Sequence, residues 1–253
     1  MMNDRFRQIA NLILPPLMWG LSSLSLIADE ARSAGEFSDM SDNLLVPSGI
    51  AFSIWFPIFI GCIAYGVYQC LPRNRDTFAL REIGPWTALG FSCICGWALI
   101  TAFLPAAYVQ WSSALIFIPA VAALLIATIR LSRYRPSLST GEIWTCFIPI
   151  SLIAGWTSIA VFLNWTPIAY DIFAGGEASV FSSLSMLALA LGFIVLMSRF
   201  MPNNWVYLLP PIWGLIFLSV RHLGGDDVQA IGIGAVIGVV ALLVTVVLGR
   251  RSA

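Results

Sequence analysis

The sequence predicts an all-α protein, a polytopic transmembrane helical bundle of about eight spans. Hydrophobic residues make up 59% of the 253 residues, and the mean hydropathy is +0.88. Charged residues make up only 10%, whereas a soluble domain carries about 25%. All 26 charged side chains, 13 basic and 13 acidic, lie in or beside the gaps between eight apolar stretches. This pattern predicts a protein embedded in a lipid bilayer, with no nucleic-acid partner.

Each apolar stretch is close to the roughly 20 residues that cross a hydrocarbon core about 30 Å thick. The seventh, residues 205–220, is the shortest. The predicted spans cover residues 9–28, 49–71, 85–104, 111–130, 143–164, 179–199, 205–220 and 228–249.

The basic residues, all arginine, predict the orientation of the chain. Only Arg32 and Arg221 lie on one side of the predicted spans. The other side holds Arg5, Arg7, Arg73, Arg75, Arg81, Arg130, Arg133, Arg135, Arg199, Arg250 and Arg251. Because cytoplasmic loops carry the excess of basic residues, we expect both termini in the cytoplasm, in a bacterial inner membrane. A cleaved signal peptide ending near Ala34 is the alternative, and it would break this alternation.

The predicted membrane interior lacks ionisable groups. No Asp, Glu, Lys, Arg or His lies deep in a predicted span, which argues against an ion-coupled pump. No nucleophile, base and orienting residue are grouped at any span end, so the chain is predicted not to be an enzyme. The lone His222 is interpreted as an exposed loop residue, and we expect no metal site and no required cofactor.

Tryptophan is the residue that points to a function. Five of the ten tryptophans lie at span ends, where indoles favour the interface. Among those inside spans, Trp55 lies about 9 Å below the outer end of its span, and Trp97 and Trp156 lie about 12 Å below theirs. Three helices thus place an indole at one depth. Two interpretations stay open here: ordinary aromatic packing, and an aromatic pocket for a flat, apolar ligand.

Two motifs carry a family resemblance. Residues 47–59, PSGIAFSIWFPIF, resemble the proline, phenylalanine and tryptophan signature of the second helix in the TspO/MBR family of tryptophan-rich sensory or translocator proteins. Residues 155–164, GWTSIAVFLN, reproduce the family's fifth-helix pattern of tryptophan, three residues, alanine, two residues and Leu-Asn. The resemblance departs at Ile94, where the family has an asparagine three residues before the tryptophan at position 97.

The resemblance implies two parts to the chain. Residues 1–165 are the length of a complete five-helix TspO-like domain. Residues 166–253 form a three-helix extension without a counterpart in the five-helix family. The family's sterol-recognition pattern lacks its basic residue here, because Asp171 follows Tyr170, so sterol binding is not expected.

The resemblance also implies a function, which is the binding of a tetrapyrrole such as a porphyrin, or a similar planar hydrophobic molecule, often by a homodimer. Carried over by position, Trp55 and Trp156 are the expected pocket walls, with Phe52, Trp97 and Asn164 as further ligand-binding candidates. Two alternatives are a transporter of an uncharged or amphipathic solute and a structural subunit of a larger membrane complex. The last span contains Gly234 and Gly238, whose spacing allows close helix packing, either within the monomer or across a dimer.

Overall fold

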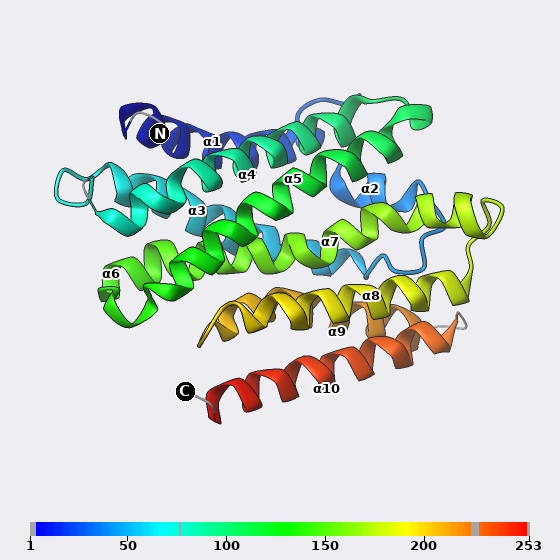
Figure 1. The fold of residues 1–253 in the computed structure, drawn as a ribbon. Coiled ribbons are helices and arrows are strands. Elements are labelled where there is room, and N and C mark those ends of the chain that lie inside the picture. The colour runs from blue at the N-terminus through cyan, green and yellow to red at the C-terminus, as the bar shows by residue number, and fades with distance from the viewer. Residues whose placement is uncertain (1–3, 76, 224–227, 252–253) are drawn as a thin grey trace.

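The computed structural model describes residues 4–75, 77–223 and 228–251, and every regular element in these ranges is helical (Figure 1). The predicted all-α fold is therefore confirmed. Asp226 and Asp227, together with the side chains of Arg250 and Arg251, lie outside the described residues. The elements are α1 (Asp4–Ser22), η1 (Leu24–Leu26), α2 (Ala34–Asp39), η2 (Gly49–Ile54), α3 (Trp55–Cys70), α4 (Phe78–Phe103), α5 (Ala106–Arg133), η3 (Arg135–Ser137), α6 (Thr140–Glu142), η4 (Ile143–Phe147), α7 (Ile148–Phe173), α8 (Val180–Arg199), η5 (Trp205–Leu208), α9 (Leu209–Leu223) and α10 (Gln229–Arg251).

Seven helical segments within the described residues are long and apolar enough to cross a membrane, and they match the second to eighth predicted spans. The chain is thus an integral, multi-pass membrane protein. The first predicted span corresponds to α1, which ends at Ser22 and is not among the seven. Its first turn contains Asp4, Arg5 and Arg7, which lower its apolar character. Helix α1 nevertheless packs along α3 and α4.

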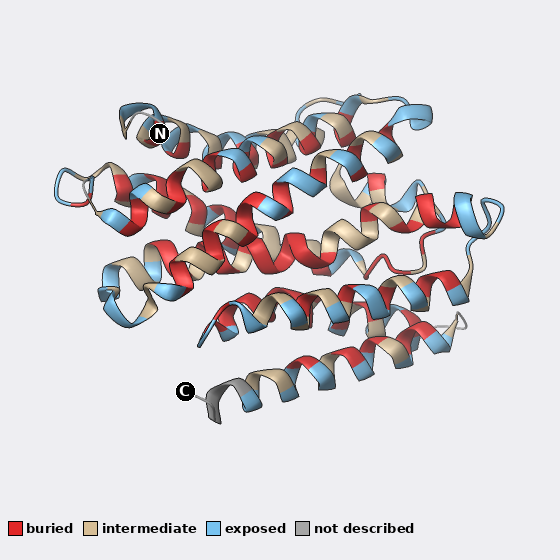
Figure 2. Cartoon of the chain, viewed as in Figure 1, coloured by how far each residue is buried: buried red, intermediate tan, exposed pale blue. Residues whose placement is uncertain are grey.

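Helix α7 forms the centre of the bundle (Figure 2). In its apolar segment 72% of the residues are buried, compared with 28% in α8 and in α10. It contacts α3 and α5 on one side and α8 and α9 on the other. Both ends of the described chain lie at one end of the bundle, together with α6, whereas α2 lies in the opposite half (Figure 1).

Buried hydrogen bonds join the last three helices to the rest of the bundle. The Asn204 side-chain amide donates to the hydroxyl oxygens of Ser132 and Ser151, at 3.0 and 2.9 Å. The Tyr207 hydroxyl donates to Ser158 Oγ at 3.0 Å. Because buried polar groups are costly when unpaired, these bonds fix η5 against α5 and α7. The division predicted between residues 165 and 166 falls inside α7, and it stays a prediction.

Helix α7 and η5 also approach each other unusually closely. A Cβ atom added at Gly155 would lie 2.1 Å from the carbonyl oxygen of Tyr207, so α7 and η5 must separate if this residue has a side chain. We expect Gly155→Ala to lower the free energy of unfolding by about 1–3 kcal/mol, the usual range for overpacking. Thermal unfolding of the detergent-purified protein measures this change.

The matched control is Gly192→Ala on α8, where an added Cβ meets no atom within 4 Å. This variant should unfold at or slightly above the wild-type temperature, because alanine favours the helix more than glycine does. Equal melting of the two variants would contradict the close packing of α7 on η5.

The glycines of α10 pack within the monomer. A Cβ at Gly234 would lie 3.0 Å from Leu184 of α8, and one at Gly238 would lie 3.1 Å from Leu191 of the same helix. The chain's own α8 therefore covers this face of α10. The homodimer stays a prediction, and this pair of glycines no longer supports it.

The connection between α1 and α3 contains an element that the spans did not predict. Residues 32–48, which we call the lid, contain the short helix α2, begun by a capping box between Ser33 and Glu36. At one end of the lid, Arg32 donates hydrogen bonds to the carbonyl oxygens of Thr101 and Leu104 at the end of α4. Phe37 of α2 points into the bundle and is buried.

The other end of the lid is held by α9. Arg221 donates to the carbonyl oxygen of Val46 at 2.9 Å, and Trp213 donates from its indole to that of Ala51 in η2, directly after the lid, at 2.9 Å. His222 Nε2 lies 2.8 Å from the carbonyl oxygen of Leu44, and because a carbonyl only accepts, this nitrogen carries the proton. We call Trp213, Arg221 and His222 the clamp. The interpretation of His222 as an exposed loop residue was wrong: its side chain is buried because it pairs with the lid.

Candidate ligand-binding site

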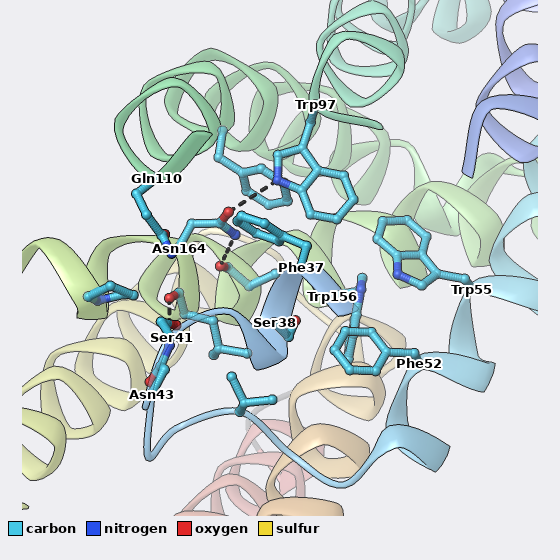
Figure 3. A pocket seen from close by; sticks show the side chains of 15 residues that line it. Phe37, Ser38, Ser41, Asn43, Phe52, Trp55, Trp97, Gln110, Trp156 and Asn164 are labelled. Carbon is cyan, nitrogen blue, oxygen red and sulfur yellow. Dashed lines mark hydrogen bonds between the residues drawn. The ribbon is translucent and has the colours of Figure 1, made fainter. Parts of the chain in front are cut away.

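A cavity lies beneath the lid, in the half of the bundle that contains α2 (Figures 1 and 3). Its walls come from the lid, η2, α3, α4, α5 and α7. Its volume is about 40 Å³. The lining residues are Phe37, Ser38, Ser41, Asn43, Val46, Phe52, Trp55, Trp97, Gln110, Phe117, Trp156, Ala160, Leu163, Asn164 and Pro167.

All five residues predicted from the sequence line this one cavity: Phe52, Trp55, Trp97, Trp156 and Asn164. The ring centroids of Trp55 and Trp156 are 6.1 Å apart, with their planes at 82°. The ring of Phe52 also contacts that of Trp156, with the centroids 6.3 Å apart and the planes at 85°. Both are edge-to-face arrangements, which aromatic pairs favour. The common depth of the three indoles thus corresponds to a common location, and their role in binding stays a prediction.

Trp97 is fixed by an asparagine on another helix. Its indole N–H donates to Asn164 Oδ1 at 3.1 Å, and Asn164 Nδ2 donates to the carbonyl oxygen of Ala160 at 2.9 Å (Figure 3). Ile94, which stands where the family has an asparagine, is buried in the apolar core. In this chain the polar partner of Trp97 therefore comes from α7.

The indoles of Trp55 and Trp156 differ from that of Trp97, because neither donates a hydrogen bond to another described residue. Their N–H groups are available to a ligand. Trp55 instead stacks on Phe59, at a centroid distance of 5.2 Å and an angle of 17°. The site thus combines one indole with a fixed orientation and two without a hydrogen-bonded partner.

The sequence reasoning missed the residues that close the site. Phe37 meets the Trp97 ring edge-to-face at 6.2 Å, and Phe117 meets it at 5.5 Å. Polar groups gather near Phe37 under the lid, from Ser38, Ser41, Asn43 and Gln110. The spacing of Ser33 and Glu36 was the available signal for a helix in the lid. Nothing in the spacing of the α5 residues marked Phe117.

All the described residues that line the cavity are uncharged. Each of the fifteen side chains is aromatic, aliphatic, hydroxyl or amide. Such a site binds through ring contacts and neutral hydrogen bonds, and it contains no group that exchanges protons near neutral pH. Over the described ranges, no three His, Cys, Asp or Glu side chains gather as metal ligands.

The cavity is small in this structure. Pockets that hold drug-sized ligands measure about 300–1,000 Å³, whereas this cavity of about 40 Å³ has room for only a few waters. A ring-sized ligand therefore enters only after side chains move. We expect the lid to move, because it is a connecting segment that contains only the six-residue helix α2, whereas α3, α4, α5 and α7 are long helices packed within the bundle.

Comparison with known proteins agrees with the motifs. A family model described as TSPO-like protein matches residues 8–248, which includes the three-helix extension. No curated protein and no solved structure matches the chain. The match extends from α1 into α10 and so covers the lid, the cavity and the clamp together. The chain belongs to the TSPO-like family.

Proposed function

We propose that this protein binds a planar hydrophobic ligand, of which a tetrapyrrole such as a porphyrin is the best candidate, in the cavity beneath the lid. The observation that carries the proposal is the convergence of six aromatic rings on one uncharged cavity. These rings come from the lid, η2, α3, α4, α5 and α7 and belong to Phe37, Phe52, Trp55, Trp97, Phe117 and Trp156. Membership in the TSPO-like family supports the same ligand class.

The chemistry of the lining favours a flat molecule with few polar groups. Indole and phenyl faces offer large contact areas to a conjugated ring. The free N–H groups of Trp55 and Trp156 can donate to a ring nitrogen or an oxygen substituent, and the amides of Asn43 and Gln110 can bind substituents near the lid. None of the described residues that line the cavity is a cation, so a carboxylate on the ligand gains no ion pair with them.

The arginine distribution extends the proposal to the direction of access. With both termini in the cytoplasm of a bacterium, the lid faces the outside of the inner membrane. The ligand then reaches the site from the outer leaflet or from the exterior. Solute transport and a structural role in a larger complex stay alternative predictions. That the protein is not an enzyme also stays a prediction.

Titration with two porphyrins tests the proposal. We expect protoporphyrin IX and its dimethyl ester both to quench the intrinsic tryptophan fluorescence of the protein in nanodiscs saturably, with the ester binding at least as tightly as the acid. The described lining offers no positive charge to the carboxylates, and burying a carboxylate without an ion pair costs free energy.

Empty nanodiscs and nanodiscs with an unrelated membrane protein, both corrected for the inner-filter effect, are the controls. Linear quenching that matches these controls would refute a binding site. A dimethyl ester that binds more than tenfold weaker than the acid would contradict an uncharged site.

A further inference from the structure

A second cavity adjoins the first, on the side of the extension. Its volume is about 20 Å³. Three residues of α7 line both cavities and form the partition between them: Trp156, Ala160 and Leu163. The remaining lining residues are Leu45, Pro47, Ile159, Phe162, Leu187, Ala190, Gly214 and Leu218.

The second cavity is apolar on all sides. Apart from the indole of Trp156, its lining contains no side chain that donates or accepts a hydrogen bond. A water molecule in a buried site needs two to four polar partners, so this cavity does not hold one stably. Hydrocarbon is the chemistry that suits it.

Small residues of the extension keep this space open. A Cβ at Gly214 of α9 would lie 3.4 Å from Cζ3 of Trp156 and 3.8 Å from Cδ1 of Ile159, which are ordinary contact distances. The structure therefore has room for a methyl group at position 214, and the glycine leaves that space empty. Ala190 of α8 is buried in the same wall. A larger residue at either position would fill the cavity.

No hydrogen bond to a described residue holds the indole of Trp156 in the partition between the two cavities, so a change of its rotamer breaks none. Trp97, by contrast, is tied to Asn164 at 3.1 Å. Ala160, the smallest member of the partition, leaves little bulk between the cavities once the indole turns.

We propose that the extension supplies a second, hydrocarbon-binding subsite beside Trp156, so that the ligand is a flat ring bearing an aliphatic chain. The ring occupies the aromatic cavity, and the chain passes the partition into the space between α7, α8 and α9. This inference rests on the proposed function, because it places a chain on the ring ligand of the first cavity. It gives the extension a role in ligand selection.

Two esters of one tetrapyrrole test the subsite. Pyropheophorbide a has a single carboxyl group, so its methyl and hexyl esters differ only in one chain. For the wild type in nanodiscs we expect the hexyl ester to bind about tenfold tighter than the methyl ester, after correction for partition into empty nanodiscs. Each buried methylene is worth about a fourfold gain in affinity, so tenfold requires burial of only part of the chain.

Variants that fill the cavity should remove this preference. We expect the ratio of the two Kd values to fall to about one in Ala190→Leu and in Gly214→Val, and to an intermediate value in Gly214→Ala. The affinity for the methyl ester should stay within about threefold of wild type in each, which also shows that the variant is folded. Gly192→Leu on α8 is the matched control, because its side chain faces open space, and it should keep the tenfold ratio.

The outcomes separate the two proposals. If the methyl ester binds the wild type and the ratio stays near tenfold in the filled variants, the subsite is refuted while the aromatic site stands. A wild-type ratio near one refutes the subsite in the same way. If neither ester binds saturably, the proposed function fails and the subsite fails with it.

Discussion

Replacing Trp55 and Trp156 together by leucine is expected to weaken porphyrin binding about a hundredfold. Buried aromatic anchors at binding sites each contribute about 2 kcal/mol or more, and two such losses amount to at least this factor. The two rings meet at 6.1 Å, and each lines the cavity from a different helix. The Soret absorbance of the bound porphyrin gives Kd without relying on the tryptophans that were removed.

The chain offers a closely matched control for this variant. Trp111 and Trp165 also meet edge-to-face at 6.1 Å, with their planes at 81°, but neither lines the cavity. Replacing both by leucine should leave Kd within about threefold of wild type. Equal losses in the two double variants would place the porphyrin elsewhere, and no loss in either would remove Trp55 and Trp156 from the site.

Loosening the clamp is expected to change the rates of binding more than the affinity. In the variant Trp213→Phe with Arg221→Met, the bonds to the carbonyl oxygens of Ala51 and Val46 are lost. The bond to Val46 joins α9 to the lid, and the bond to Ala51 joins α9 to η2 directly after it. We expect both bonds to persist when ligand is bound, so their loss should lower the free energy of lid opening in the free and in the bound protein. A hydrogen bond from a charged donor contributes about 1.5–3 kcal/mol, which predicts association and dissociation rates at least tenfold faster, with Kd changed by less than about threefold.

Stopped-flow mixing with porphyrin measures both rates. Arg221→Lys keeps a cationic donor and should restore part of the slow exchange. Arg199→Met changes the last residue of α8, whose end lies in the half of the bundle opposite α2 (Figure 1), and should match wild type. Unchanged rates in the double variant would show that the lid does not control access. A higher Kd with an unchanged association rate would show that the clamp stabilises the shape of the binding site and does not limit lid opening.

The sequence predicted the membrane spans well, because the signal is local. An apolar stretch near 20 residues that ends at charges forms a helix with few alternatives in a bilayer. The predicted spans from 49–71 onward all correspond to helical segments. The first was less accurate, because α1 begins at Asp4 and contains Arg7. That side chain is buried and donates to Gln69 Oε1 and to the carbonyl oxygen of Leu80.

The candidate site was predicted in part. Depth along a helix can be counted from the sequence, and it placed Trp55, Trp97 and Trp156 at one level. Which neighbour a side chain points toward depends on how the helices pack, and this is why Phe117 was missed. Phe37 was missed for a different reason: it belongs to α2, a six-residue helix in a polar connection that hydropathy does not detect.

The clamp could not be predicted, because its contacts are long-range. His222 lies 178 positions from its partner Leu44, and Trp213 lies 162 positions from Ala51. A histidine next to an arginine at a span end is typical of an exposed loop. In the folded chain the side chain of His222 is buried and pairs with the carbonyl oxygen of Leu44 in the lid. The contribution of the extension to the site therefore emerges only in the folded chain.

Fluorine NMR tests the central claim, that a planar ligand binds between Trp55, Trp97 and Trp156. The protein, labelled with 5-fluorotryptophan, reports from ten positions, each assigned by a Trp→Phe substitution. On adding protoporphyrin IX, ring currents should shift the resonances of these three tryptophans and leave Trp86 and Trp144, at the other end of the bundle, unmoved. Shifts confined to the other tryptophans, or equal small shifts at all ten, would contradict the account.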